Sequence, residues 1–153
     1  MASDSTDHAR QSTSDDRDDA DRPMHERFAA ALRAFEDTGT DGDLIALYAD
    51  DCRVGNIVTG ERHHGPGGAA EFWSSYRNQF ERIESTFTLV AGDDSGAVLE
   101  WESAGSAKGD DVSYRGATVL EYDGEAIVRS MAYFDPRAVG RQLVEAAEVS
   151  RPS

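Results

Sequence analysis

The run STFTLVAGDDSGAVLEWESAGSAKGDDVSYRGATVLEYDGEAIVRSMAYF, residues 85–134, contains four segments rich in β-branched and aromatic residues. Short spacers rich in Gly, Asp and Ser separate the segments, and spacers of this length join antiparallel neighbours. The segments are STFTLVA (85–91), GAVLEWESAG (96–105), VSYRGATVLEY (112–122) and AIVRSMAYF (126–134). The second half of the chain is therefore predicted to form an antiparallel β meander.

Helical periodicity precedes this run. In residues 24–36 large apolar side chains recur on one helical face, and Pro23 suits the first turn of a helix. Asp43 can cap a short second helix. The apolar side chains expected to point inward from it are Leu44, Leu47 and Tyr48.

Between these helices and the meander, we expect a strand at 52–58, a loop at 60–68 and a third helix at 69–82. The apolar side of the third helix would carry Phe72, Trp73, Tyr76 and Phe80. Helices followed by consecutive strands predict an α+β domain in which a curved antiparallel sheet wraps around the N-terminal helices. A strongly bent sheet covered on one face leaves a cavity at its wide end.

The two ends of the chain differ from this middle part. Residues 1–22 contain seven Asp and three Arg but no aromatic residue, Val, Ile or Leu, so we expect a disordered acidic tail. Residues 23–153 would form the single domain. Asp135 and Pro136 have the pattern of a helix start, which predicts a C-terminal helix over RAVGRQLVEAAE (137–148).

The formal net charge is −15, which disfavours binding to nucleic acid and to an anionic membrane surface. The basic residues are fourteen Arg and one Lys, Lys108. This bias suits a cytoplasm of high salt, where screening relieves self-repulsion, but a GC-rich genome explains it equally well. Both explanations stay open.

Cys52 is the only cysteine, so no intramolecular disulfide is possible, and a small buried filler is expected in preference to a nucleophile. The N-terminus lacks the basic start and apolar stretch of a signal peptide, and no apolar run reaches the length of a transmembrane helix. A cytoplasmic location is the expectation.

Three segments in this order resemble the SnoaL-like branch of the nuclear transport factor 2-like superfamily. They are GDLIALYADDCRVGN (42–56), HHGPGGAAEFWSSY (63–76) and DGEAIVRSMAYFDP (123–136). The resemblance implies a cone-shaped fold with a pocket inside the cone, and often a homodimer formed through the outer face of the sheet. The group includes polyketide cyclases, ketosteroid isomerases, limonene epoxide hydrolases and proteins that only bind ligands, so the fold does not settle the function.

The resemblance also implies where acid–base groups would lie, and other residues occupy those positions. Asn56 stands where an isomerase would carry its base, and Ala132 stands where cyclases and hydrolases carry an Asp. The Arg and Asp of the epoxide hydrolases fall at Trp101 and Ser103. Asp135 is the nearest substitute, but its Asp-Pro context favours a helix cap. We therefore expect a noncatalytic or weakly catalytic protein.

Strand alternation and the third helix together predict the pocket wall. The wall residues are Val54, Asn56, Phe72, Trp73, Tyr76, Leu99, Trp101, Ser103, Ser130 and Ala132. This apolar and aromatic set suits a flat or hydrophobic organic molecule, with no cofactor. The same aromatic residues could instead fill the core completely.

An enzyme of the cyclase, isomerase or hydrolase type remains an alternative, with His64 or Glu102 as the catalytic group. His64 precedes Gly65 in a Gly-rich loop that approaches the expected pocket, and a bulge before Gly105 would turn Glu102 inward. Two solvated loop histidines are the plainer interpretation of His63 and His64. No further ligand lies at metal-binding spacing, so no metal is expected.

A third alternative is an interaction module that uses the outer sheet face. On that face Arg53, Arg115 and Arg129 would pair with Glu100 and Glu102. The GPGG stretch follows no strand of βαβ type, so we interpret it as a turn and not as a phosphate cradle.

Overall fold

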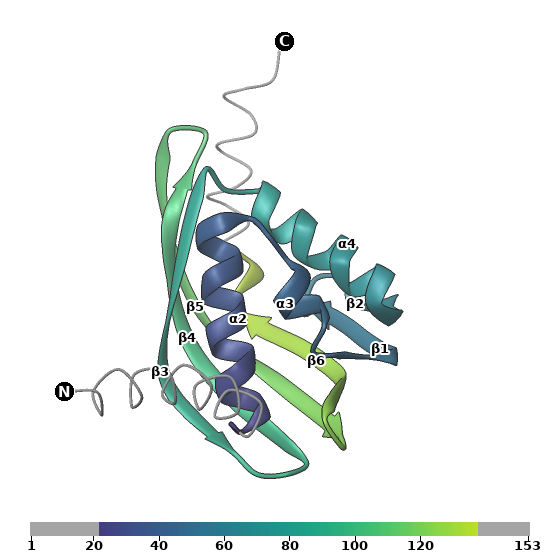
Figure 1. The fold of residues 1–153 in the computed structure, drawn as a ribbon. Coiled ribbons are helices and arrows are strands. Elements are labelled where there is room, and N and C mark those ends of the chain that lie inside the picture. Colours follow the sequence, from purple (N-terminus) through teal and green to yellow (C-terminus); the bar gives the residue numbers. More distant parts are fainter. Residues whose placement is uncertain (1–21, 138–153) are drawn as a thin grey trace, which may run out of the picture.

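The computed structural model describes residues 22–137, which form one six-stranded sheet with helices against its concave side (Figure 1). The helices are α2 (Met24–Thr38), α3 (Gly42–Ile45) and α4 (Gly65–Asn78). The strands are β1 (Tyr48–Asn56), β2 (Gly60–His64), β3 (Arg82–Gly92), β4 (Gly96–Ala107), β5 (Asp110–Asp123) and β6 (Ala126–Phe134). The predicted α+β class is confirmed, and the sheet is curved and not closed.

The strand order is β2-β1-β6-β5-β4-β3, so the predicted meander from β3 to β6 pairs in sequence order. Four of the five neighbouring pairs are antiparallel, but β1 and β6 run parallel. The expected antiparallel sheet is therefore corrected to a mixed one. The periodicity of a strand does not reveal its partner, and these partners are joined by most of the domain.

The segment 60–68 is not the predicted loop. Its first half forms β2, an antiparallel partner of β1, and its second half is the first turn of α4. α4 therefore begins at Gly65 and ends at Asn78, four residues earlier at each end than the predicted helix. A Cβ on Gly68 would lie 2.9 Å from the backbone carbon of His63, so the glycine lets α4 pack directly on β2.

The core lies between the sheet and the three helices α2, α3 and α4. Leu44, Leu47 and Tyr48 are buried as predicted, but only Leu44 lies in α3, and Tyr48 begins β1. The predicted cap Asp43 lies inside α3, and Asp41 precedes the helix instead. The largest fully buried side chains are Phe28, Leu44, Cys52, Val54, Leu99, Leu120 and Ile127. Burial raises the pKa of the Cys52 thiol, which agrees with a filler role.

At the end of β6 the backbone N–H of Arg137 donates to Asp135 Oδ1 over 3.0 Å, the geometry expected of a helix cap. The rest of the predicted helix 137–148 and residues 1–21 of the predicted tail lie outside the described residues. No helix between residues 22 and 137 is long and apolar enough to cross a membrane.

Candidate functional site

A cavity of about 370 Å³ lies between α4 and the concave face of the sheet. The fifteen described residues that line it include no Lys, Arg, Asp or Glu. They are Asn56, Val58, Thr59, His63, Phe72, Ser75, Tyr76, Gln79, Ser85, Trp101, Ser103, Tyr114, Ala132, Phe134 and Pro136. The cavity is therefore an aromatic hollow with a few neutral polar groups, which is the usual make-up of a small-molecule site.

Aromatic rings follow one another around this hollow. The ring centroid of Tyr114 lies 5.3 Å from that of Trp101 and 5.8 Å from that of Phe134, both in edge-to-face geometry. On the helix side the His63 and Phe72 centroids are 5.6 Å apart. Edge-to-face pairs of this kind hold each ring in one orientation, so the wall is preformed.

The structure brings six of the ten predicted wall residues to the cavity, namely Asn56, Phe72, Tyr76, Trp101, Ser103 and Ala132. The other four are buried outside the cavity wall, namely Val54, Trp73, Leu99 and Ser130.

The position of a residue along its strand decides whether it lines the cavity or lies in the packed core. Val54 pairs with Ser130, and Asn56 with Ala132 two residues further along both strands. The first pair is buried and does not line the cavity, whereas the second pair lines it. Alternation selects the correct face of a strand but not the level at which the packed core ends.

Trp73 lies outside the cavity wall for a different reason. Its ring packs against Phe28 and Phe35 of α2, with centroids 6.1 and 6.4 Å away, and its indole N–H donates to the Tyr48 hydroxyl over 3.0 Å. It therefore joins α4 to α2, while the neighbouring Phe72 faces the cavity.

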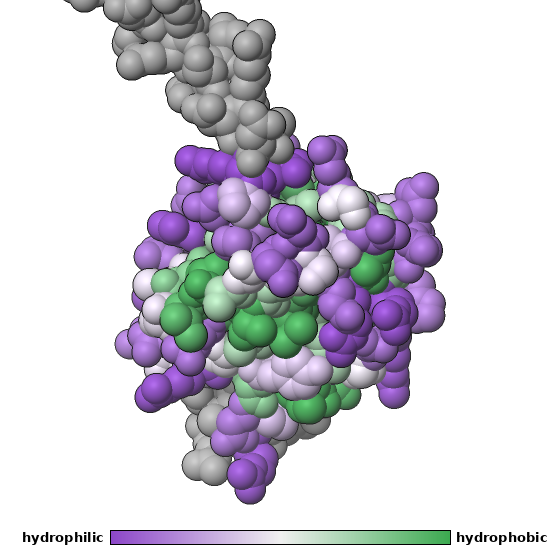
Figure 2. Space-filling model, turned by 90° about the horizontal axis from the view of Figure 1, so that it is seen from below, coloured by the Kyte–Doolittle hydropathy of each residue, from purple (hydrophilic) through white to green (hydrophobic). Residues whose placement is uncertain are grey.

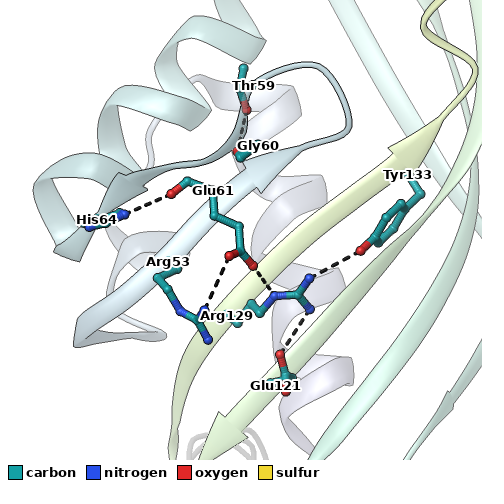
Figure 3. Close-up of polar contacts among 8 residues, drawn as sticks. All are labelled: Arg53, Thr59, Gly60, Glu61, His64, Glu121, Arg129 and Tyr133. Carbon is teal, nitrogen blue, oxygen red and sulfur yellow. Dashed lines mark hydrogen bonds and ion pairs between the residues drawn. The ribbon is translucent and has the colours of Figure 1, made fainter.

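Neither predicted catalytic group lies in the cavity wall. The His64 side chain is exposed, and its Nε2 lies 2.9 Å from the backbone carbonyl of Glu61 (Figure 3). Glu102 is exposed on the opposite face of β4, because the β4–β5 register runs without a bulge from Gly96 to Ala107.

His63 lines the cavity instead of His64. Consecutive residues of a strand point to opposite faces, and the loop predicted for this segment gives no such alternation, so the sequence does not tell which of the two histidines faces the cavity. The Nδ1 atom of His63 is buried and has no hydrogen-bond partner among the described residues.

The outer face of β1, β2, β5 and β6 carries an ionic cluster (Figure 3). Arg129 contacts Glu61, lies 3.1 Å from the carboxylate of Glu121, and donates to Tyr133 over 3.3 Å. Arg53 lies 3.4 Å from Glu61. Arg53 and Arg129 therefore pair with Glu61 and Glu121 in place of the expected Glu100 and Glu102. The hydrogen bond from the Arg129 guanidinium lowers the pKa of Glu61.

Sequence reasoning missed Glu36, which is only 3% exposed and lies behind the cavity wall. Its Oε2 accepts hydrogen bonds from the Tyr76 hydroxyl and the Ser85 hydroxyl, each 2.6 Å long. Its Oε1 accepts from the Ser85 backbone N–H over 2.8 Å. The Ser85 and Ser103 hydroxyl oxygens are 2.6 Å apart, so the network reaches the cavity through Tyr76, Ser85 and Ser103.

A signal for Glu36 was present in the sequence. Phe28, Leu32 and Glu36 are spaced by four residues, which puts the carboxylate on the buried face of α2. A glutamate at the end of an amphipathic helix is usually solvated, so this spacing alone does not predict a buried carboxylate.

Burial raises the pKa of the Tyr76 and Tyr114 hydroxyls above the ordinary value for tyrosine, and the Glu36 charge contributes to both shifts. Both side chains therefore remain protonated at neutral pH. No group of three or more His, Cys, Asp or Glu between residues 22 and 137 is arranged to hold a metal ion.

Comparison of the fold with solved structures gives many relatives of low sequence identity. A protein from Catenulispora acidiphila with a ketosteroid isomerase-like fold, in complex with trimethylamine, has a TM-score of 0.67 and 20% identity over 76% of this chain and 92% of its own. An epoxide hydrolase of M. tuberculosis has a TM-score of 0.61 and 21% identity over 82% and 90% of the two chains.

A third relative, TerC co-crystallised with polyporic acid, has a TM-score of 0.68 and 12% identity over 80% of this chain and 99% of its own. At these identities the likeness concerns the fold alone. A search of curated proteins gave no significant match. The profile of the SnoaL-like domain matches residues 25–130, and the chain therefore belongs to the SnoaL-like domain family.

Proposed function

We propose that this protein binds a small, flat and largely apolar organic molecule in the cavity between α4 and the sheet. The observation that carries the proposal is a volume of about 370 Å³, walled by aromatic rings, that the protein's own side chains leave unfilled. Two proteins of similar fold hold small organic molecules, trimethylamine in one and polyporic acid in the other.

We propose further that binding, with little or no catalysis, is the main role. The fifteen described wall residues include no carboxylate that could serve as a general acid or base within hydrogen-bond reach of the ligand. The cyclase, isomerase or hydrolase alternative loses support because His64 and Glu102 are exposed away from the cavity. His63 is the imidazole that such chemistry would have to use.

Replacing Ala132 with phenylalanine tests where the ligand binds. Ala132 lines the cavity from β6, so the added ring would occupy the space of a ligand. We expect the affinity for an aromatic probe, 2-naphthylmethanol, to fall at least about tenfold in isothermal titration calorimetry.

The matched control is Ala30→Phe, an exposed position on α2 outside the cavity and away from the outer sheet face, which should leave probe affinity unchanged. Equal probe affinity in wild type and Ala132→Phe, with the circular dichroism spectrum retained, would show that the probe binds elsewhere.

We also propose that two copies associate through the outer sheet face. Val98 and Tyr133 are exposed large apolar side chains on that face, because their strand neighbours point to the interior. Leu89, Val90 and Val98 flank the β3–β4 turn, and hydrophobic surface gathers among polar side chains on the lower side of the molecule (Figure 2).

Sedimentation velocity would check this association. We expect the wild type to sediment as a dimer and Val98→Glu to sediment as a monomer, since a buried unpaired charge opposes association. Ile57→Glu, at an exposed position in the β1–β2 turn, is the control that should stay dimeric. A wild type that remains monomeric at 100 µM contradicts the proposal.

A further inference from the structure

We propose that the molecule bound in the cavity carries a protonated amine, which contacts the hydroxyl oxygens of Tyr76 and Ser103 in front of the buried Glu36 carboxylate. This inference rests on the proposed function and deepens it, because it names the chemical class of the ligand. Three features of the cavity support it: an unneutralised charge behind the wall, the direction of the hydroxyl hydrogens, and aromatic walls.

The Glu36 carboxylate is buried without an ion-pair partner within 4.0 Å among residues 22–137. Its three hydrogen-bond donors are neutral groups of Tyr76 and Ser85. The nearby Arg77 guanidinium donates to the backbone carbonyls of Glu36 and Phe80, not to the carboxylate. Both carboxylate oxygens therefore act as acceptors of hydrogen bonds from neutral donors, with no cation beside them, directly behind the cavity wall.

The hydroxyl hydrogens of Tyr76, Ser85 and Ser103 are all directed toward this carboxylate. Tyr76 and Ser85 each have one hydroxyl hydrogen, and both donate it to Glu36 Oε2. The hydrogen between Ser85 and Ser103 must then come from Ser103. The oxygens of Tyr76 and Ser103 at the cavity wall therefore have only lone pairs to offer. Any group that hydrogen-bonds to them must donate, which the neighbouring Tyr114 hydroxyl can do to Tyr76 and a ligand would do to Ser103.

The remaining wall also favours a cation. The indole N–H of Trp101 is taken up by the Thr118 hydroxyl over 2.9 Å, so Trp101 offers the cavity only its ring. The negative faces of Trp, Tyr and Phe rings attract ammonium groups. A carboxylate or phosphate ligand would meet no Lys or Arg among the described wall residues.

Three probes of one shape test the inference at pH 7: 2-naphthylmethylamine, which is positively charged, 2-naphthylmethanol, which is neutral, and 2-naphthoate, which is negative. We expect the amine to bind the wild type about tenfold or more tighter than the alcohol, and the naphthoate to bind weakest. Calorimetry with the full chain measures all three.

Glu36→Gln removes the charge and reverses the hydrogen-bond direction, because its amide N–H donates where the carboxylate accepted. The hydroxyls of Tyr76 and Ser103 then become able to donate into the cavity. We expect the amine-to-naphthoate affinity ratio to fall about 10- to 100-fold. Glu84→Gln is the matched control, since Glu84 is exposed beside Ser85 and does not line the cavity, and its ratio should equal that of the wild type.

If Glu36→Gln does not fold, the wild-type probe order and Ser103→Ala decide. Ser103→Ala removes one acceptor and should lower the amine-to-naphthoate ratio severalfold. Equal binding of amine and alcohol to the wild type overturns the inference but leaves the proposed function standing. Absence of binding by all three probes overturns both. An unchanged ratio in a folded Glu36→Gln variant overturns the inference alone.

Discussion

Replacing Glu36 with leucine is expected to lower the free energy of unfolding by about 3 kcal/mol. Leucine is of similar size but accepts no hydrogen bond, so the Tyr76 hydroxyl, the Ser85 hydroxyl and the Ser85 backbone N–H all lose their acceptor. The two hydroxyls can turn toward the cavity, which they line, but the N–H is held in β3. A buried donor without a partner carries most of the cost.

Urea denaturation followed by circular dichroism measures this loss. Glu71→Leu, at an exposed position in the middle of α4, is the control and should change stability by less than about 0.5 kcal/mol. Glu36→Gln should be less damaging than Glu36→Leu, because the amide can still accept from the Ser85 N–H. If Glu36→Leu is as stable as the wild type, the hydrogen-bond network behind the cavity contributes nothing to folding.

Replacing Trp73 with alanine is expected to cost about 3–5 kcal/mol of unfolding free energy. Trp73 is 5% exposed and contacts Phe28 and Phe35 of α2, as well as Phe72 and Tyr76 of its own helix. Its removal would leave a hole between α2 and α4, and the surrounding rings can fill it only in part.

Thermal and urea unfolding of Trp73→Ala measure the cost. Trp73→Phe should lose only about 1–2 kcal/mol, because it keeps a ring but not the N–H bond to Tyr48. Since Trp73 does not line the cavity, Trp73→Phe should bind 2-naphthylmethanol as the wild type does. A large loss of binding with unchanged stability would mean that Trp73 is a wall residue after all.

Much of the fold followed from local pattern. The turn-rich spacers between 85 and 134 predicted a meander, and β3 to β6 form one. The parallel pairing of β1 with β6 was missed, because the residues of β1 alternate in the same way whichever strand lies beside them. The loop predicted at 60–68 was wrong because the segment pairs with β1 and because Gly68, a residue type that usually marks a turn, serves close packing of α4 on β2.

The site was harder to predict than the fold. The strand phase of β4 correctly put Trp101 and Ser103 on the inner face and Glu102 on the outer face, with no bulge to reverse it. His64 was chosen over His63 because the segment was not recognised as a strand. Glu36 was passed over because its burial depends on β3, which is distant in sequence.

Periodicity in the chain was enough to establish α2 and the strands β3 to β6, and the side of each that faces inward, because these depend on the geometry of a few consecutive residues. Tertiary structure alone decided where the packed core stops and the cavity begins, and that a carboxylate of α2 meets hydroxyls of α4 and β3. Such contacts depend on how far one element lies along another, and no local repeat encodes that distance.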